Sequence, residues 1–241
     1  MAANILLDDR YARNKTTIQP SDQKKLANSA VCVVGCGGLG GSVIEGLARV
    51  GVGTLTVVDC DAFEPSNLNR QLLSNEMNIG EPKAIAAKNR VSIINSSVRV
   101  AVMLERFTAE TGNKIVHGHD VVVDALDNIP SRMDLEKVCE EEGIPIIHGA
   151  IGGWNGQLAV IKPGERLLHK LYDVDWNGDL TRIDVCSTEE KRMGNPSFTP
   201  MVLAGMEVAE TIKLLIEKET PIEGKIMMVD LLNHQYEIIS I

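Results

Sequence analysis

The sequence Ala30-Val-Cys-Val-Val34, followed without a break by Gly35-Cys-Gly-Gly-Leu-Gly40, contains the strongest structural signal in the chain. Five consecutive apolar residues next to glycine predict a strand that is buried on both faces. The glycines have the spacing G-x-G-x-x-G, in which the first forms a tight turn, the second lets a phosphate approach the backbone, and the third lets a helix pack on the strand. Apolar residues at helical spacing follow over residues 43–50. The pattern therefore predicts a strand–loop–helix unit that binds a nucleotide.

Further strands and helices alternate on the carboxyl side of this unit. Strands are predicted at 54–59, 98–104, 120–126 and 144–148, and helices at 82–94, 109–116 and 131–142. Strands that alternate with helices are typical of a parallel sheet covered on both faces. We therefore expect an α/β fold, with a Rossmann-like, mostly parallel sheet and helices on both faces.

The pattern changes after about residue 155. A strand at 156–162 precedes a long polar segment, 165–196, which is weakly patterned. An amphipathic helix is predicted over 199–218, and two strands, 225–231 and 235–241, look like a closing hairpin. We expect one domain, 1–241, with an antiparallel C-terminal extension. Its parts are an N-terminal helical arm (1–29), a nucleotide-binding core (30–153) and a closing part (154–241).

Composition excludes several classes of protein. The formal net charge is −9 and aromatic residues make up 3% of the 241 residues, so binding to nucleic acid is disfavoured. The five cysteines include no C-x-x-C pair, which disfavours a disulfide framework and a four-cysteine zinc site. There is no apolar signal core and no apolar run of about 18 residues, so we expect a cytoplasmic protein without a membrane span.

Polar residues that follow the predicted strands indicate which nucleotide is bound. Asp59 ends the second strand at about the distance expected for an acid that binds ribose hydroxyls. The residues after the strand ends converge at the mouth of an open α/β sheet, where Arg70 and Lys83 suit a triphosphate. Asp124 and Asp127 offer hard oxygen ligands for Mg²⁺. Each of these charged residues taken alone is better explained as a solvated surface charge, but together at one rim they favour ATP. For the glycine loop, nucleotide binding is favoured over a packing turn, because a strand, a helix and Asp59 accompany it.

Several motifs in order carry a family resemblance. They are Gly35-Cys-Gly-Gly-Leu-Gly40, Asp59-Cys-Asp61, Ser66-Asn-Leu-Asn-Arg-Gln71, Gly80-Glu-Pro-Lys83, and Asp127-Asn128 with Arg132. With them the chain resembles the MoeB/ThiF/HesA adenylyltransferases, a family similar to the adenylation domain of ubiquitin-activating enzymes. The resemblance extends along nearly the whole chain, and it implies that the closing part, 154–241, binds the carrier and contains the crossover loop.

The resemblance implies an enzyme that uses ATP and Mg²⁺ to activate the C-terminal carboxylate of a small ubiquitin-like sulfur-carrier protein ending in Gly-Gly. The products are an acyl-adenylate and pyrophosphate. It implies that Asp59 binds the ribose, that Asp127 binds Mg²⁺ or orients the phosphate, and that Arg13 reaches the partner's site in a homodimer. It gives catalytic roles to Arg13, Arg70, Lys83 and Asp127, and cofactor contacts to Gly35, Gly37, Gly38, Gly40, Asp59, Asp61, Asn67, Asn69, Gln71 and Asn128.

The chain also departs from that family. Its typical members carry two zinc-binding C-x-x-C pairs, which this chain lacks, so no zinc is expected. The family's crossover-loop cysteine nucleophile corresponds to a place near Arg192, and Cys186 is therefore only a weak candidate. Cys60 is expected to be a packing residue, and His148, at the end of the fifth strand, is expected to face the ligand.

Other readings stay open. Relatives without zinc activate a peptide C-terminus or a carboxylate on modified tRNA, and the acidic charge balance argues modestly against tRNA. A nicotinamide-dependent oxidoreductase explains the glycine loop and Asp59 but gives no task to Arg70, Lys83 or Asp127. A non-catalytic nucleotide sensor leaves the same three residues unexplained.

Overall fold

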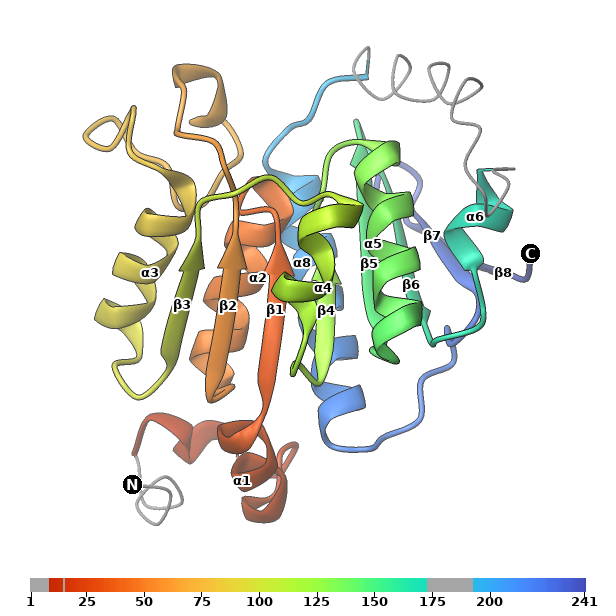
Figure 1. The fold of residues 1–241 in the computed structure, drawn as a ribbon, viewed down its shortest axis with the longest axis horizontal. Helices are drawn as coiled ribbons and strands as arrows, with labels where there is room; N and C mark the ends of the chain where they lie inside the picture. Colours follow the sequence, from red (N-terminus) through yellow and green to blue (C-terminus); the bar gives the residue numbers. More distant parts are fainter. Residues whose placement is uncertain (1–8, 15, 173–192) are drawn as a thin grey trace.

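One twisted sheet forms the centre of the molecule in the computed structural model, which describes residues 9–14, 16–172 and 193–241 (Figure 1). The strand order is β3-β2-β1-β4-β5-β6-β7-β8. Neighbours from β3 to β5 pair in parallel, and β6, β7 and β8 are added antiparallel. The predicted fold class is therefore confirmed. The strands are β1 (Ala30–Val34), β2 (Thr54–Val58), β3 (Arg99–Met103), β4 (Val121–Asp124), β5 (Ile146–Gly152), β6 (Asn155–Ile161), β7 (Ile226–Asp230) and β8 (Gln235–Ile239).

Helices cover the two faces of the sheet. Val31 and Val33 of β1 pack in one apolar cluster with α2, α3 and α8, whereas Cys32 and Val34 pack in a second cluster with α4 and α5. Alternate residues of a strand point to opposite faces, so an unbroken apolar run can fill both clusters. The helices are α1 (Pro20–Asn28), α2 (Gly38–Val50), α3 (Lys83–Ile94), α4 (Ala109–Val116), α5 (Ile129–Glu142), α6 (Leu167–Leu171) and α8 (Phe198–Leu215), with 3-10 turns η2 (Asp9–Asn14) and η3 (Pro65–Asn67).

A few element boundaries differ from those predicted. The helix α2 begins inside the glycine motif, at Gly38, and β5 continues to Gly152 because it pairs with β6 over its whole length. The helix α6 lies in the segment predicted to be a long loop, and it has only five residues. No helix in the described ranges is long and apolar enough to span a membrane.

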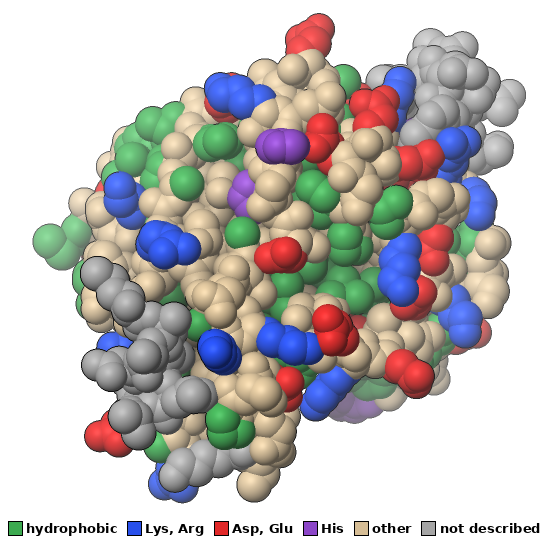
Figure 2. All heavy atoms as spheres, turned by 60° about the horizontal axis from the view of Figure 1, so that its bottom comes forward, with side chains coloured by type: hydrophobic (Ala, Val, Ile, Leu, Met, Phe, Trp, Pro, Cys, Tyr) green, Lys and Arg blue, Asp and Glu red, His purple; other side chains and the backbone are tan. Residues whose placement is uncertain are grey.

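The ends of the sheet have different surroundings (Figure 1). The chain reverses its direction of winding between β1 and β4, and such a switch point opens a crevice at the carboxyl ends of the strands. The N-terminal elements η2 and α1 lie at the other end of the sheet. Figure 2 views the molecule from the side of that end, where acidic and basic side chains are interspersed and form no single basic patch.

Candidate active site

The glycine loop connects β1 to α2 in a conformation that requires glycine at two positions. Gly35 has φ +100°, and a Cβ there would lie 2.4 Å from the carbonyl oxygen of Ala125. A Cβ on Gly40 would lie 1.8 Å from the carbonyl oxygen of Gly35. A side chain fits at neither position, so the turn stays tight and the N-terminus of α2 faces the crevice.

A pocket of about 380 Å³ opens beside this loop. It lies at the carboxyl ends of β1, β2 and β4, where the switch point predicts a ligand. Ten of the predicted site residues line this pocket together: Gly35, Gly37, Gly38, Asp59, Asp61, Arg70, Gln71, Lys83, Asp127 and Asn128.

Asp59 follows β2 directly and is held in place by backbone groups. Its Oδ2 accepts a hydrogen bond from the Cys36 amide at 2.8 Å, and its Oδ1 accepts one from the Asp61 amide at 2.8 Å. Burial raises the pKa of the Asp59 carboxyl, and these two amide bonds offset part of that effect. The result is an oriented acceptor at the pocket wall, suited to hydroxyl groups.

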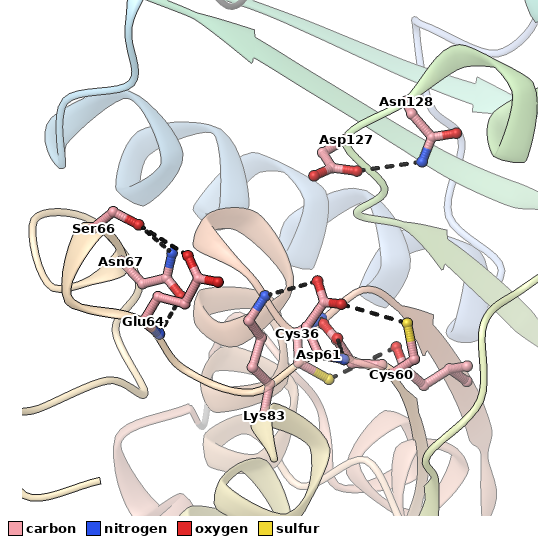
Figure 3. A network of polar contacts seen from close by, with 11 residues as sticks. Cys36, Cys60, Asp61, Glu64, Ser66, Asn67, Lys83, Asp127 and Asn128 are labelled. Carbon is pink, nitrogen blue, oxygen red and sulfur yellow. Dashed lines mark hydrogen bonds and ion pairs between the residues drawn. The ribbon is translucent and has the colours of Figure 1, made fainter. Parts of the chain in front are cut away.

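Lys83 begins α3 and points toward Asp61 across the pocket floor (Figure 3). Its Nζ lies 3.2 Å from Asp61 Oδ2, and only 8% of Lys83 is exposed. Burial alone would raise the pKa of Asp61, but the Lys83 ammonium outweighs this effect and the pKa is lowered. The site thus contains a pre-formed ion pair in which Asp61 fixes the lysine.

The loop after η3 supplies Arg70 and Gln71 to the pocket. Arg70 Nη1 donates to the Ser66 carbonyl oxygen at 3.0 Å and to Asn69 Oδ1 at 2.9 Å. Asn69 in turn donates from Nδ2 to the Asn195 carbonyl oxygen at 3.0 Å. Asn67 is buried and accepts from the Glu64 amide at 3.0 Å. Asn67 and Asn69 therefore support the loop, and neither lines the pocket.

Asp127 and Asn128 face the glycine loop from the far side of the pocket (Figure 3). Asn128 Nδ2 donates to Asp127 Oδ1 at 3.3 Å, while Asn128 Oδ1 accepts from the Ser131 amide and caps α5. Asp127 is exposed and sits before the N-terminus of this helix. An exposed carboxylate on the wall of a polar pocket has the hard oxygen donors that suit Mg²⁺.

Asp124 and His148 are not pocket residues, contrary to the expectations for both. Each is fully buried. Asp124 Oδ1 accepts from the Leu126 amide at 3.0 Å, and Asp124 Oδ2 lies 2.7 Å from His148 Nδ1. Asp124 lies inside the sheet, so its oxygens are occupied by protein groups and it cannot serve as a magnesium ligand in this pocket.

Comparison with known proteins matches the ThiF family model over residues 11–241. The chain belongs to the ThiF family. It is 35% identical to the SAMP-activating enzyme E1 of Haloferax volcanii, over 96% of this chain and 84% of that protein. It is 32% identical to a sulfur carrier protein adenylyltransferase of Thermus thermophilus, over 97% of this chain and 87% of that protein. The protein is an enzyme, an adenylyltransferase of this family.

The fold of this ThiF family member is shared with solved structures. The microcin C7 biosynthetic enzyme MccB, in complex with N-formylated MccA, superimposes with a TM-score of 0.82 at 23% identity. The superposition covers 98% of this chain and 73% of MccB. At that identity the likeness concerns the fold alone.

Three predicted site residues remain: Arg13, Gly40 and Cys186. Arg13 belongs to η2, at the end of the sheet opposite the pocket (Figure 1). Cys186 lies outside the described residues. Gly40 is buried in the first turn of α2 and serves packing rather than the pocket surface.

Some pocket residues escaped the sequence analysis. Cys60 is exposed and lines the pocket, contrary to the expectation of a packing role. Glu105 and Arg106, which follow β3, also line it. The rule that located Arg70, that the residues after strand ends meet at one rim, applies equally to β3 and would have found them. Among the described residues, Asp59, Cys60 and Asp61 form the one group whose potential metal-ligand atoms lie within 4.8 Å of one another, but Asp61 is already paired with Lys83.

Proposed function

We propose that this protein adenylates the C-terminal carboxylate of a small ubiquitin-like sulfur-carrier protein that ends in Gly-Gly, using ATP and Mg²⁺. The observation that carries the proposal is the pocket itself. A phosphate-binding glycine loop, the acceptor Asp59, the cations Arg70 and Lys83, and the carboxylate of Asp127 line one cavity. The names of the two relatives point to the same class of substrate, because one activates SAMP and the other acts on a sulfur carrier protein.

The proposed reaction places few demands on acid–base chemistry. A carboxylate is already a competent nucleophile, so it attacks the α-phosphate without a general base and releases pyrophosphate. Catalysis then rests on positioning and on stabilisation of the charge that develops on the phosphates. Asp59 would hold the ribose, the start of α2 would face the phosphates, and Arg70 and Lys83 would neutralise them, with Gln71 at the same rim.

Mg²⁺ fits the donor set at Asp127. This residue is exposed on the pocket wall, opposite Lys83 and Asp61 (Figure 3). When bound, the metal would supply charge neutralisation at the phosphates. Asn128 would hold the carboxylate of Asp127 in the orientation that the metal requires, through the contact at 3.3 Å.

The proposal includes a homodimer in the cytoplasm. Arg13 and the pocket of its own chain lie at opposite ends of the sheet (Figure 1), so this arginine can complete only the pocket of a second copy. The symmetric arrangement of a twofold dimer would give each pocket the arginine of its partner. The step after adenylation, in which Cys186 would accept the activated group, is not required for the first reaction.

A pyrophosphate-exchange assay tests the proposal. The protein is incubated with labelled pyrophosphate, ATP, Mg²⁺ and purified carrier candidates, each paired with a control carrier that lacks its last two glycines. We expect label to enter ATP with an intact carrier and not with the truncated one. Absence of exchange with every carrier, together with tight binding of NAD, would replace this proposal with an oxidoreductase.

The same assay examines Cys186. We expect Cys186→Ala to exchange label at the wild-type rate, because attack of a carboxylate on ATP uses no thiol. A loss of exchange in this variant would show that Cys186 takes part in adenylation itself.

A further inference from the structure

Four buried polar side chains meet beside the pocket, near the carboxyl end of β4, and one of them, Arg132, also lines the pocket. Asp124, Arg132, His148 and Glu207 come from β4, α5, β5 and α8, and each is at most 2% exposed. Burying charged groups is costly unless they are paired, so such a cluster is not explained by packing alone. The proposed reaction assigns none of them a task.

The contacts of this cluster converge on the backbone of one residue. The amide of Leu126 donates to Asp124 Oδ1 at 3.0 Å, and the carbonyl oxygen of Leu126 accepts from Arg132 Nη2 at 2.7 Å. Both polar backbone groups of Leu126 are thus held by buried side chains. Leu126 itself lines the pocket and directly precedes Asp127.

His148 fixes the anchoring carboxylate from behind. Its Nδ1 lies 2.7 Å from Asp124 Oδ2, and since a carboxylate accepts, Nδ1 carries the hydrogen. The guanidinium of Arg132 approaches the same oxygen, with Nε at 3.7 Å. One carboxylate oxygen of Asp124 therefore accepts a hydrogen bond from Leu126 and the other accepts one from His148. The carboxylate cannot rotate without breaking one of these two bonds.

We propose that His148 is a positioning residue for adenylation: through Asp124 it fixes Leu126, and thereby the place of Asp127 in the pocket. The inference rests on the proposed function for its catalytic consequence, although the anchoring itself does not. The loop has two further fixed points, the Ala125 amide bonded to Val34 and the Asn128 cap of α5. Leu126 is the anchor that lies next to Asp127 on the side of β4.

The surroundings make this anchor stiff. Burial raises the pKa of Glu207 well above its usual range, with a smaller contribution from Asp124. A Cβ on Gly149 would lie 2.3 Å from Glu207 Oε1, which shows how closely α8 approaches β5 here. In such an environment of low polarity, hydrogen bonds to a charged carboxylate are stronger than at the surface.

Two substitutions distinguish positioning from space filling. Asparagine places an amide N–H near the position of Nδ1, whereas glutamine places its amide near Nε2. We therefore expect His148→Asn to retain the bond to Asp124 and His148→Gln to lose it. His119→Gln is the matched control, because the ring of His119 also makes hydrogen bonds within the protein, to Val116 and Thr56, but lies before β4 at the far end of the sheet.

Kinetics give the first readout. The ground-state contacts to ATP that we propose for the glycine loop, Asp59, Arg70 and Lys83 do not pass through Leu126. We expect His148→Gln to lower kcat of carrier-dependent exchange by about 10- to 100-fold, as small displacements of catalytic groups do. The KM for ATP should change by less than roughly threefold. His148→Asn should restore most of kcat, and His119→Gln should match the wild type.

Hydrogen exchange of the ligand-free protein gives a second readout that needs no activity. The peptide covering residues 124–129 should exchange faster in His148→Gln than in the wild type or in His148→Asn. If glutamine does not fit the buried site and the variant fails to fold, His148→Ala provides the same comparison without the added length. Should the wild type exchange no pyrophosphate with any carrier, the proposed function fails while this measurement still decides the anchoring.

Wild-type kcat and unchanged protection of residues 124–129 in the folded Gln or Ala variant would overturn the inference. Equal losses in His148→Asn and His148→Gln would overturn it too, because they would mean that the bulk of the imidazole matters and its Nδ1 does not. An unchanged kcat combined with faster exchange would show that Leu126 is anchored but that the position of Asp127 does not depend on it.

Discussion

Arg70 shows how a single half-buried cation can be placed for one task. Its guanidinium is tethered to Ser66 and to Asn69, so its head is held at the pocket wall before any ligand arrives. A donor that is oriented in advance stabilises developing charge without reorganisation, and removal of one such donor costs about 100- to 1000-fold in rate.

We expect Arg70→Ala to lower kcat/KM for carrier-dependent exchange by roughly 100-fold or more. Arg49→Ala is the matched control, because Arg49 pairs with Glu45 in the last turn of α2, at the end of that helix away from the pocket. The control should exchange at the wild-type rate. If both arginine variants are equally impaired, general loss of charge or stability is responsible rather than contact with the phosphates.

Glu207 gives a prediction about stability. The pKa of Glu207 is raised in the folded protein. When the pH is above the pKa of a glutamate in the unfolded chain, about 4.3, the folded state therefore keeps a proton that the unfolded state has released. The folded state then binds more protons, so the free energy of unfolding falls as pH rises, by at most about 1.4 kcal/mol per pH unit. This contribution to stability is complete below the unfolded pKa and is lost toward the folded pKa.

Glu207→Gln should remove this dependence, because its amide stays neutral. Urea denaturation at pH 5 and pH 8 measures the effect: the wild type should lose more stability between the two values than the variant. Glu219→Gln, at an exposed position, should follow the wild type. Parallel curves for wild type and Glu207→Gln would mean that Glu207 is ionised in the folded protein.

Asp124 and Asp127 show that residue type alone does not predict which of two nearby carboxylates lies in the pocket. They are three positions apart in the same acidic stretch, and both are plausible magnesium ligands by residue type. Residues in β4 are enclosed by the sheet, whereas Asp127 has left it, and the point at which a strand ends is uncertain by a few residues from sequence. Cys60 and His148 were misplaced for related reasons: Cys60 has left the sheet two residues after the end of β2, whereas His148 lies inside β5, which continues to Gly152.

At the scale of elements, the sheet and its long helices were predictable, and α6 was not. Regular alternation of apolar runs and amphipathic segments specifies β1 to β5 and the helix α8. By contrast, α6 has five residues and thus hardly more than one turn of periodicity. Its start is held by Glu136 of α5, whose carboxylate accepts from the amides of Leu168 and His169. Such a helix depends on a tertiary contact 32 residues away, which no local pattern contains.

The N-cap residue of α5, Asn128, also contacts a residue of the pocket. Asn128 accepts from the Ser131 amide and also contacts Asp127, so it both starts the helix and orients a pocket residue. Loss of a cap costs about 1 kcal/mol. We expect Asn128→Ala to lower the free energy of unfolding by about that amount and to lower carrier-dependent exchange.

Thr108→Ala is the matched control for this prediction. Thr108 caps α4 by accepting from the Thr111 amide, and it does not line the pocket. We expect Thr108→Ala to lower the free energy of unfolding by a similar amount, about 1 kcal/mol, and to keep full exchange activity. If the two variants lose activity in proportion to their stability, the cap matters only for folding and Asn128 does not orient Asp127.

At the scale of the whole molecule, the position of Arg13 sets a geometric condition. The elements η2 and α1 are fixed at the amino end of the sheet, where Tyr11 is buried and Asn95 donates to its hydroxyl at 2.8 Å. This anchoring separates Arg13 from the pocket of the same chain (Figure 1). An arginine that acts in catalysis from this position must act on a second copy.

Mixing two inactive variants tests this arrangement. In a dimer of Arg13→Ala with Arg70→Ala, one pocket has its own Arg70 and the partner's intact arginine at position 13, while the other pocket lacks both. Random pairing of equal amounts gives half mixed dimers, each with one complete pocket, so exchange should recover to roughly a quarter of the wild-type rate. Each variant alone should stay inactive, and subunit exchange should be needed for the recovery. No recovery in confirmed mixed dimers, or full activity of Arg13→Ala by itself, would show that each pocket works without an arginine from its partner.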